Sequence, residues 1–260
     1  MITSSQIKLI RSLQQKKFRD KHMLYVMEGE KLVEELTGGR AGSEHRIHKL
    51  FANGEWIGRN KPVLSGSGIE AVETEPSAMK KVSKLVTPSQ VLALVHIPDT
   101  GLNEKELAVS PVLAFESIRD PGNLGTIIRT ADWFGIGQVI CTPDSADVYN
   151  PKVVQASMGA ITRVRVSYAD ITKILENAII QGRAVYGTFL DGDNIYQMSL
   201  DKNPVILFGN ESRGLSDRYD PYISQRLSIP SFSRKRAGSE SLNVASSVAV
   251  ICSELTRSGN

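Results

Sequence analysis

Hydrophobic positions in the first 97 residues change their spacing several times, which predicts a small α/β unit. Ile7, Ile10 and Leu13 recur at helical spacing behind Ser4 or Ser5, either of which could cap a helix. Short apolar runs bounded by turn-forming residues predict strands. We expect strands over 24–27, 47–52 and 91–97, and further helices over 30–36 and around 79–86. A linker follows over 98–107, since it begins with several turn formers.

From residue 108 onwards, apolar runs alternate with amphipathic segments, as strands and helices do in a parallel sheet. We expect strands over 112–116, 139–142, 163–167, 184–190, 205–209 and 227–230. We expect helices over 124–134, 151–161, 171–181 and 243–257, the last with one apolar stripe. The pattern therefore predicts an α/β protein with a small first domain, 1–97, and a parallel-sheet domain, 108–260.

Composition agrees with a folded protein that stays in the cytoplasm. The 260 residues are 41% hydrophobic and 23% charged, close to the globular norm. No apolar run approaches the roughly 18–20 residues of a membrane span, and the basic first 21 residues lack the apolar centre of a signal peptide. Cys141 and Cys252 match no metal-ligand or disulfide spacing. We expect a cytoplasmic protein with no metal and no membrane contact.

The net charge of +3 is unevenly distributed. Residues 1–100 hold 15 Lys and Arg against 11 Asp and Glu, a net of +4, whereas the remainder holds 16 against 17. The first 22 residues contain one Asp and six basic side chains, which are Lys8, Arg11, Lys16, Lys17, Arg19 and Lys21. Such a cluster is typical of a surface that binds a polyanion, although a solvated helix face explains the charge equally well.

Candidate chemistry begins in the segment 115–135, where a strand runs into a tight turn and then a helix. This places the helix start at the carboxyl edge of the sheet, where open α/β sheets bind ligands. Asn123 opens the helix and Arg129 lies six residues further on, so the Arg points sideways from the row of Asn123. Taken alone, Asn123 could be a helix N-cap and Arg129 a surface residue.

Two later segments repeat this arrangement at the ends of other strands. In 205–215 an apolar strand runs into Gly209 and Glu211, and a glycine there would let the backbone approach a ligand closely. An ordinary β-turn would explain that segment as well. In 227–248 a strand, a basic loop and a helix follow one another, and Ser241 could simply cap the helix.

Together the three segments resemble the SpoU (TrmH) family of RNA ribose 2′-O-methyltransferases. The motifs are DPGNLGTIIRTADWFG (120–135), LFGNESRGLS (207–216) and IP…SLNVASSVA (229–249). Residues 1–97 are similar to the ribosomal-L30-like RNA-binding domain that often precedes the catalytic domain, through the basic first helix and the segment LYVMEGEKLVEEL (24–36). The resemblance implies a deep trefoil knot of the SPOUT type in the parallel-sheet domain, and a homodimer formed through it.

The resemblance also implies S-adenosylmethionine as cofactor and transfer of its methyl group to a ribose 2′-hydroxyl of RNA. By motif position, the cofactor lies against Thr188, Gly209, Ile229 and Leu242. The implied catalytic residues are Arg129, Asn123, Glu211, Ser241 and Asn243. Arg129 acts beside the 2′-hydroxyl, either as a base or as a group that binds the target phosphate and stabilises the alkoxide. Guanidinium groups stay protonated, which makes them poor bases, and both roles remain open.

The loop between Pro230 and Ser241 is longer than the family pattern. It adds Arg234, Lys235 and Arg236, which predicts a second contact with an RNA backbone. Ribosomal RNA is the expected substrate, because the first domain is similar to a ribosomal-protein fold. A tRNA-directed enzyme and a catalytically silent RNA-binding protein of the same fold are the alternatives.

Overall fold

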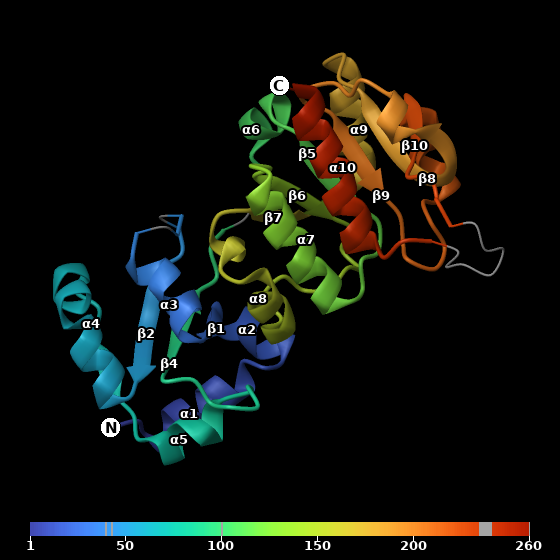
Figure 1. Ribbon diagram of the computed structural model, residues 1–260. Coiled ribbons are helices and arrows are strands. Elements are labelled where there is room, and N and C mark those ends of the chain that lie inside the picture. The colour runs from blue at the N-terminus through green and yellow to red at the C-terminus, as the bar shows by residue number, and fades with distance from the viewer. Residues whose placement is uncertain (40, 43, 100, 234–240, 260) are drawn as a thin grey trace. The chain divides into compact units, whose positions relative to one another are not determined.

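The chain forms two compact units (Figure 1). The computed structural model describes every residue except 40, 43, 100, 234–240 and 260. One unit combines Met1–Asp99 with Asp147–Arg163, and the other combines Thr100–Ala146 with Val164–Asn260. The packing of residues 147–163 with the first unit is a feature that the sequence pattern did not predict.

In the described residues, the first unit is built on a four-stranded sheet in the order β1-β4-β2-β3. Its strands are β1 (Leu24–Glu28), β2 (Ile47–Ala52), β3 (Ala71–Glu73) and β4 (Val91–His96). β4 pairs antiparallel with β1 and β2, while β3 runs parallel to β2. The mixture of directions distinguishes this small sheet from the parallel sheet of the second unit.

Helices cover both faces of the first sheet. Leu24 and Val26 join a core cluster with residues of α1 (Ser4–Ser12) and α5 (Pro76–Val82). Tyr25 points to the opposite face because strand side chains alternate, and its ring lies 4.7 Å from that of Tyr149. On that side α8 (Pro151–Ser157) and α3 (Glu30–Thr37) contact β1. The segment 147–163 thus covers part of this sheet.

The N-terminal helix differs from its prediction in two ways. Thr3, rather than Ser4 or Ser5, caps α1, and it forms a capping box with Gln6. The basic segment then continues as a separate helix, α2 (Lys16–His22). The sequence pattern also missed α4 (Gly54–Ser67), whose glycines and internal proline obscure its periodicity. Asn53 caps α4 by accepting a hydrogen bond from the backbone of Trp56.

In the described part of the second unit a six-stranded sheet has the order β10-β8-β9-β5-β6-β7, and every pair is parallel, as predicted. Its strands are β5 (Val112–Phe115), β6 (Gln138–Cys141), β7 (Arg165–Tyr168), β8 (Val185–Asn194), β9 (Val205–Phe208) and β10 (Gln225–Ser228). Parallel strands place all their carboxyl ends at one edge, so the residues that follow them converge there.

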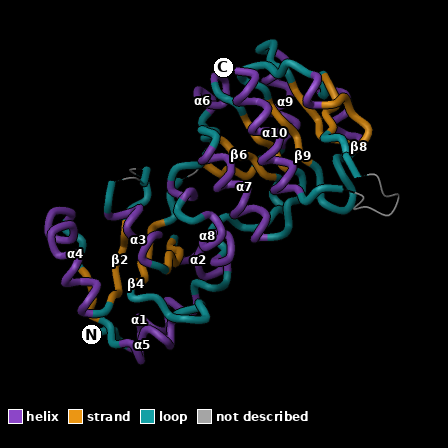
Figure 2. Tube along the Cα trace, in the orientation of Figure 1, coloured by secondary structure: helices purple, strands orange, loops and turns teal. Residues whose placement is uncertain are grey.

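Two layers of helices cover this sheet. α6 (Glu104–Val109), which begins inside the predicted linker, and α9 (Ile171–Ile180) pack against Val112, Ala114 and Leu207 on one face. α7 (Pro121–Trp133) and α10 (Val244–Gly259) pack against each other, as Figure 2 shows. Short 3₁₀ helices follow α8, β8 and β9; they are η1 (Ala160–Thr162), η2 (Ile195–Gln197) and η3 (Asp217–Tyr222). None of the described helices is long and apolar enough to cross a membrane.

The pairing of β8 with β10 shifts its register where the two backbones approach each other closely. Arg226 pairs with Gly187, but the next residue, Leu227, pairs with Asp193, so residues 188–192 leave the ladder. A Cβ atom on Gly192 would lie 2.6 Å from the carbonyl carbon of Leu227. The two backbones therefore pass at a distance that excludes any side chain at position 192.

Candidate active site

The helix that carries Asn123 is capped three residues earlier than the sequence suggested. The carboxylate of Asp120 accepts a hydrogen bond from the backbone N–H of Asn123 at 2.8 Å, and Pro121 occupies the first helical position. The prediction of a helix start at Leu124 was therefore wrong, and so was the alternative that Asn123 is the cap. Because Asp120 is the cap, the side chain of Asn123 is available for other partners.

Asn123 links all three motifs through its amide group. Its Nδ2 donates a hydrogen bond to Oε1 of Glu211, 88 residues later in the chain. Its Oδ1 accepts one from Nδ2 of Asn243 at 3.1 Å, 120 residues later. The Glu211–Asn123–Asn243 chain of hydrogen bonds thus joins three of the predicted catalytic residues, on the loop after β9, on α7 and before α10.

Asn243 also caps the last helix. Its Oδ1 accepts hydrogen bonds from the backbone N–H groups of Ala245, at 2.9 Å, and Ser246, at 3.4 Å. The alternative that Ser241 is the cap is therefore wrong. Ser241 is exposed and makes no hydrogen bond with another described residue, so the structure does not join it to the Glu211–Asn123–Asn243 chain.

A short loop after β9 presents Glu211. The backbones of Asn210 and Gly214 exchange two hydrogen bonds, of 3.0 and 2.9 Å, which close the loop. A Cβ atom on Gly209 would lie 2.1 Å from the carbonyl carbon of Gly214. The chain's own backbone therefore requires a glycine at position 209, a reason that the sequence did not reveal.

Arg129 lies apart from these residues within its own chain. It is exposed on α7 and makes no hydrogen bond or ion pair with a described residue. Six residues of helix place it about 9 Å along the axis from Asn123 and roughly 120° around it. This is the sideways direction that the sequence spacing predicted, and the structure leaves the guanidinium group without a partner among the described residues.

The four predicted cofactor contacts follow adjacent strands and the loop before α10. Thr188 comes after the part of β8 that pairs with β9, Gly209 follows β9 and Ile229 follows β10, and all three are half-buried. Leu242 is 52% exposed, two residues before α10. Apolar side chains and backbone amides at one sheet edge suit an adenine ring, which needs a few hydrogen bonds and apolar contact. The residues present are therefore compatible with S-adenosylmethionine.

The basic residues of the first unit divide into two groups. Lys8, Arg11, Lys16, Lys17 and Lys21 are exposed, as a polyanion-binding surface requires. Arg19 is not: it is 2% exposed, its Nη2 lies 2.5 Å from Oδ2 of Asp147, and its Nη1 donates to the carbonyl of Leu13 at 2.8 Å. The prediction of an RNA contact for Arg19 was wrong, because this side chain joins α2 to the segment 147–163.

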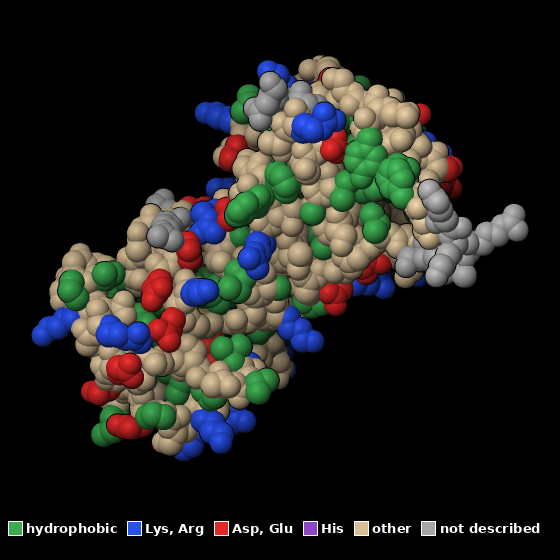
Figure 3. All heavy atoms as spheres, viewed as in Figure 1, with side chains coloured by type: hydrophobic (Ala, Val, Ile, Leu, Met, Phe, Trp, Pro, Cys, Tyr) green, Lys and Arg blue, Asp and Glu red, His purple; other side chains and the backbone are tan. Residues whose placement is uncertain are grey.

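Sequence analysis missed two further basic residues beside this cluster. Lys80 and Lys81 occupy the last turn of α5, which packs against α1, and both are exposed. Figure 3 shows Lys and Arg side chains gathered over the end of the first unit where these helices lie. The spacing of charges in the sequence could not predict that α1 and α5 pack against each other. The predicted contacts Arg234, Lys235 and Arg236 lie outside the described residues.

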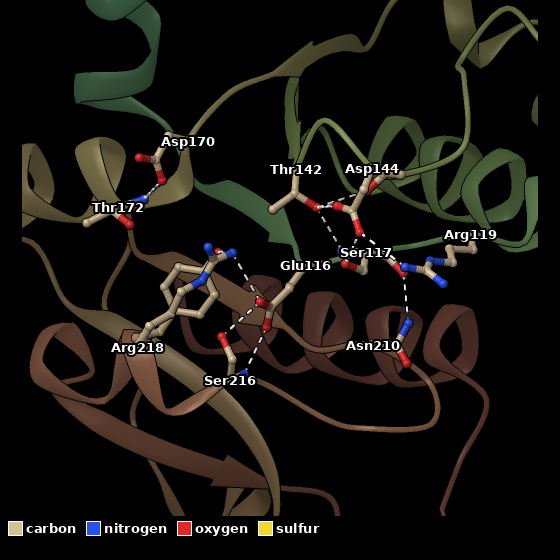
Figure 4. A network of polar contacts seen from close by, with 12 residues as sticks. Glu116, Ser117, Arg119, Thr142, Asp144, Asp170, Thr172, Asn210, Ser216 and Arg218 are labelled. Carbon is tan, nitrogen blue, oxygen red and sulfur yellow. Dashed lines mark hydrogen bonds and ion pairs between the residues drawn. The ribbon is translucent and has the colours of Figure 1, made fainter.

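Beside the three motifs, polar residues at the ends of β5 and β6 form a network that sequence reasoning also missed (Figure 4). Its central groups are the carboxylates of Glu116 and Asp144. An open pocket of about 300 Å³ adjoins the network, and it is lined by Thr142, Pro143, Asp144, Ala169, Asp170 and Arg218. None of the predicted site residues lines this pocket. Among the described residues, no group of three or more His, Cys, Asp or Glu could hold a metal ion.

Comparison with known proteins identifies the family. Residues 110–253 match the SpoU rRNA Methylase family, and residues 4–93 match the MRM3-like substrate binding domain. The chain belongs to the SpoU rRNA methylase family. The first match contains all three motifs, and the second coincides with the small α/β sheet and its helices.

Individual relatives extend over nearly the whole chain. The 23S rRNA (guanosine(2553)-2′-O)-methyltransferase RlmP of Bacillus subtilis is 28% identical over 95% of this chain and 94% of its own. A TrmH-family protein from Porphyromonas gingivalis is 35% identical, with a TM-score of 0.82 over 99% of both chains. An rRNA methyltransferase from Sinorhizobium meliloti, solved with AdoMet bound, is 26% identical, with a TM-score of 0.79 over 99% of this chain and 96% of its own.

Proposed function

We propose that this protein transfers a methyl group from S-adenosylmethionine to a ribose 2′-hydroxyl of ribosomal RNA. The observation that carries the proposal is the Glu211–Asn123–Asn243 chain, which brings the three family motifs to one place. Membership of the SpoU rRNA methylase family and the substrate-binding first unit support it. The B. subtilis relative, whose name gives 23S rRNA as substrate, favours rRNA over tRNA.

S-Adenosylmethionine, when bound, supplies a methyl group that is already activated on a sulfonium sulfur. Thr188, Gly209, Ile229 and Leu242 would hold it at the carboxyl edge of β8, β9 and β10. The AdoMet-bound relative from S. meliloti supports this cofactor. The close approach of β8 and β10 at Gly192 is compatible with the trefoil knot that we propose for this unit.

The chain's own residues must orient the acceptor and stabilise its charge. Positioning alone can supply roughly 7–11 kcal/mol in the best-oriented reactions. Glu211 and Asn123 offer a carboxylate oxygen and an amide to the ribose, while Asn243 fixes Asn123 from the other side. Ser241, two residues before Asn243 in the chain, is exposed and would contact the RNA. Arg129 keeps its proton and stabilises the negative charge that develops on the 2′-oxygen.

We place Arg129 near the interface of a homodimer formed through the second unit. Its exposed guanidinium has no partner among the described residues of its own chain. Trp133, in the last turn of the same helix, is 85% exposed, and both Trp and Arg are residue types enriched at protein interfaces. The exposed cations of α1, α2 and α5 then bind the RNA backbone. We propose the cytoplasm as the place where the protein acts.

Incubation with labelled S-adenosylmethionine and total RNA, followed by mapping of the modified ribose, tests the proposal. Label should appear at a 2′-O-methyl group in rRNA. Label confined to tRNA would show that the substrate is tRNA and not rRNA. Failure to bind S-adenosylmethionine in calorimetry would refute the proposed methyltransferase activity.

Arg129→Ala should abolish methyl transfer while the affinity for S-adenosylmethionine stays within a few-fold, because the guanidinium acts on the acceptor rather than on the cofactor. Single-turnover assays and calorimetry on the same preparation measure both. Retained turnover would remove Arg129 from the mechanism.

A further inference from the structure

The loop that carries Glu211 is attached at both ends to one pair of residues. At its start, Nδ2 of Asn210 donates to the backbone carbonyl of Ser117 at 2.9 Å. At its end, the backbone N–H and the hydroxyl of Ser216 each donate to the carboxylate of Glu116 at 2.8 Å. Glu116 and Ser117 follow β5 directly, and Figure 4 shows Asn210 and Ser216 approaching them from the loop.

The same pair of residues leads into α7, which begins at Pro121 and carries Asn123. Glu116 and Ser117 are thus connected to Asn123 through the five residues 118–122 of the chain, and to the Glu211 loop through hydrogen bonds. Any displacement of the loop relative to Glu116 changes the separation of Glu211 from Asn123. The position of the carboxylate of Glu211 therefore depends on how firmly these attachments hold.

Ser117 is fixed in an uncommon conformation. Its φ of 55° lies in the left-handed region, which costs a residue with a Cβ roughly 1–2 kcal/mol. Residues that follow β6 hold it there: its N–H donates to Oγ1 of Thr142 at 2.8 Å, and its hydroxyl donates to Asp144. The hydrogen bonds from Ser117 and then Thr142 lower the pKa of Asp144, so this acceptor stays ionised at neutral pH.

Glu116 is largely shielded from water and has several donors. Its side chain is 12% exposed, and besides Ser216 it accepts a hydrogen bond from Nη2 of Arg218 at 3.1 Å. Hydrogen bonds to a carboxylate are stronger than those between neutral groups, and more so when water is excluded. A carboxylate in this place holds the end of the loop more firmly than a neutral group of the same shape.

We propose that Glu116 is a positioning residue for methyl transfer, which fixes the loop 209–216 so that Glu211 meets Asn123. In this proposal Glu116 acts through Glu211 and has no direct contact with substrate or cofactor. The inference rests on the proposed role of Glu211 and adds what determines the place of its carboxylate.

Glu116→Gln tests the inference, because it keeps the shape of the side chain and removes the charge. We expect kcat to fall about 10–100-fold, since a misplacement of about 1 Å can cost roughly 100-fold. The KM for RNA and the affinity for S-adenosylmethionine should change less than about threefold, because binding groups stay in place. Ser216→Ala, which removes only the hydroxyl donor, should give a smaller fall in kcat with the same constancy of KM.

A double-mutant cycle with Glu211→Asp shows whether Glu116 acts through Glu211. Glu211→Asp alone should lower kcat, because it withdraws the carboxylate by one methylene. Glu116→Gln should then cost far less in this background than in the parent, since the position that it protects is already lost. Equal costs in the two backgrounds, or a parent-like kcat for Glu116→Gln, would overturn the inference while the proposed function stands.

Two controls separate the other outcomes. Glu176→Gln removes a carboxylate from α9, where it accepts from the hydroxyl of Tyr222 at 3.3 Å, and should leave kcat unchanged. A comparable loss in this control would mean that charge in general, and not the loop, matters, which overturns the inference. No transfer to RNA by the parent, or full activity of Glu211→Asp, would overturn the role of Glu211 together with the inference.

Discussion

Asn243 combines two duties in one side chain. Its Oδ1 caps α10, and its Nδ2 holds Asn123. A carboxylate or a hydroxyl could perform the first duty, since Asp and Ser are N-caps as good as Asn. A carboxylate cannot donate, and a hydroxyl has one short-armed oxygen for both contacts, whereas an amide carries its acceptor and its donor on separate atoms. The residue type at this position is therefore explained by the pair of contacts, and by neither contact alone.

Asn243→Asp should separate the two duties. The cap remains, so we expect thermal stability close to that of the parent. The donor to Asn123 is replaced by a negative charge near Glu211, which should lower kcat about tenfold, for a cost of roughly 1–2 kcal/mol. Asn243→Ala should in addition lose about 1 kcal/mol of stability with the cap. Thermal unfolding and methyl transfer assays measure both, and a fully active Asn243→Asp would show that the amide donor is dispensable.

At the scale of elements, the loop after β9 illustrates how backbone crowding selects a residue. Gly209 lies against the backbone of Gly214, and the two hydrogen bonds between Asn210 and Gly214 close the loop behind it. A side chain at 209 must push these segments apart. The loop then no longer presents Glu211 in its place.

Gly209→Ala should therefore lower both stability and activity. A contact of 2.1 Å between Cβ and a backbone carbon forces the backbone to move, and we expect a loss of about 2 kcal/mol or more in the free energy of unfolding. The matched control is Gly58→Ala in α4, where a Cβ would meet nothing within 4 Å. It should gain roughly 0.5–1 kcal/mol. Urea unfolding of both variants checks the contrast, and equal effects would contradict it.

Periodicity predicted the elements whose apolar faces are regular, including all six parallel strands and the stripe of α10. It failed where polar side chains decide the boundary. The start of α7 depends on the carboxylate of Asp120 bonding to Asn123, and several nearby residues were equally good caps by type. The Glu211–Asn123–Asn243 chain was anticipated only through the family motifs. The contacts of Glu116 join residues 100 and 102 positions apart, and no local pattern reports them.

At the scale of the molecule, the N-terminal basic residues of the first unit fall into two classes. Most of the N-terminal basic residues are exposed, whereas Arg19 is buried against Asp147. Their types and spacing are alike, so the sequence could not separate them. Burial decides the matter: a shielded ion pair holds the fold together, and an exposed cation is available to a phosphate.

Arg19→Ala should mainly lower stability, whereas Lys16→Ala should mainly weaken RNA binding. Arg19→Ala leaves Asp147 without its partner and should cost roughly 2–3 kcal/mol of stability. Lys16→Ala should change stability by less than about 0.5 kcal/mol. It should lower the slope of log affinity against log salt by about 0.7–0.9 if Lys16 neutralises one RNA phosphate. Unfolding in urea measures the stability changes, and RNA binding over a salt series measures the slope. An unchanged slope would show that Lys16 is a solvated residue that does not contact RNA.

The first unit is also discontinuous in the chain. The ring of Tyr25 rests on Tyr149, the side chain of Gln155 donates to the carbonyl of Glu28 at 2.7 Å, and Arg163 pairs with Glu35 at 2.6 Å. A fragment that stopped at residue 99 would expose one face of its sheet. It would also leave Arg19 without Asp147, its ion-pair partner. A single cut in the gene would therefore not release this substrate-binding unit with all of its contacts, because residues 147–163 complete it from a distant part of the sequence.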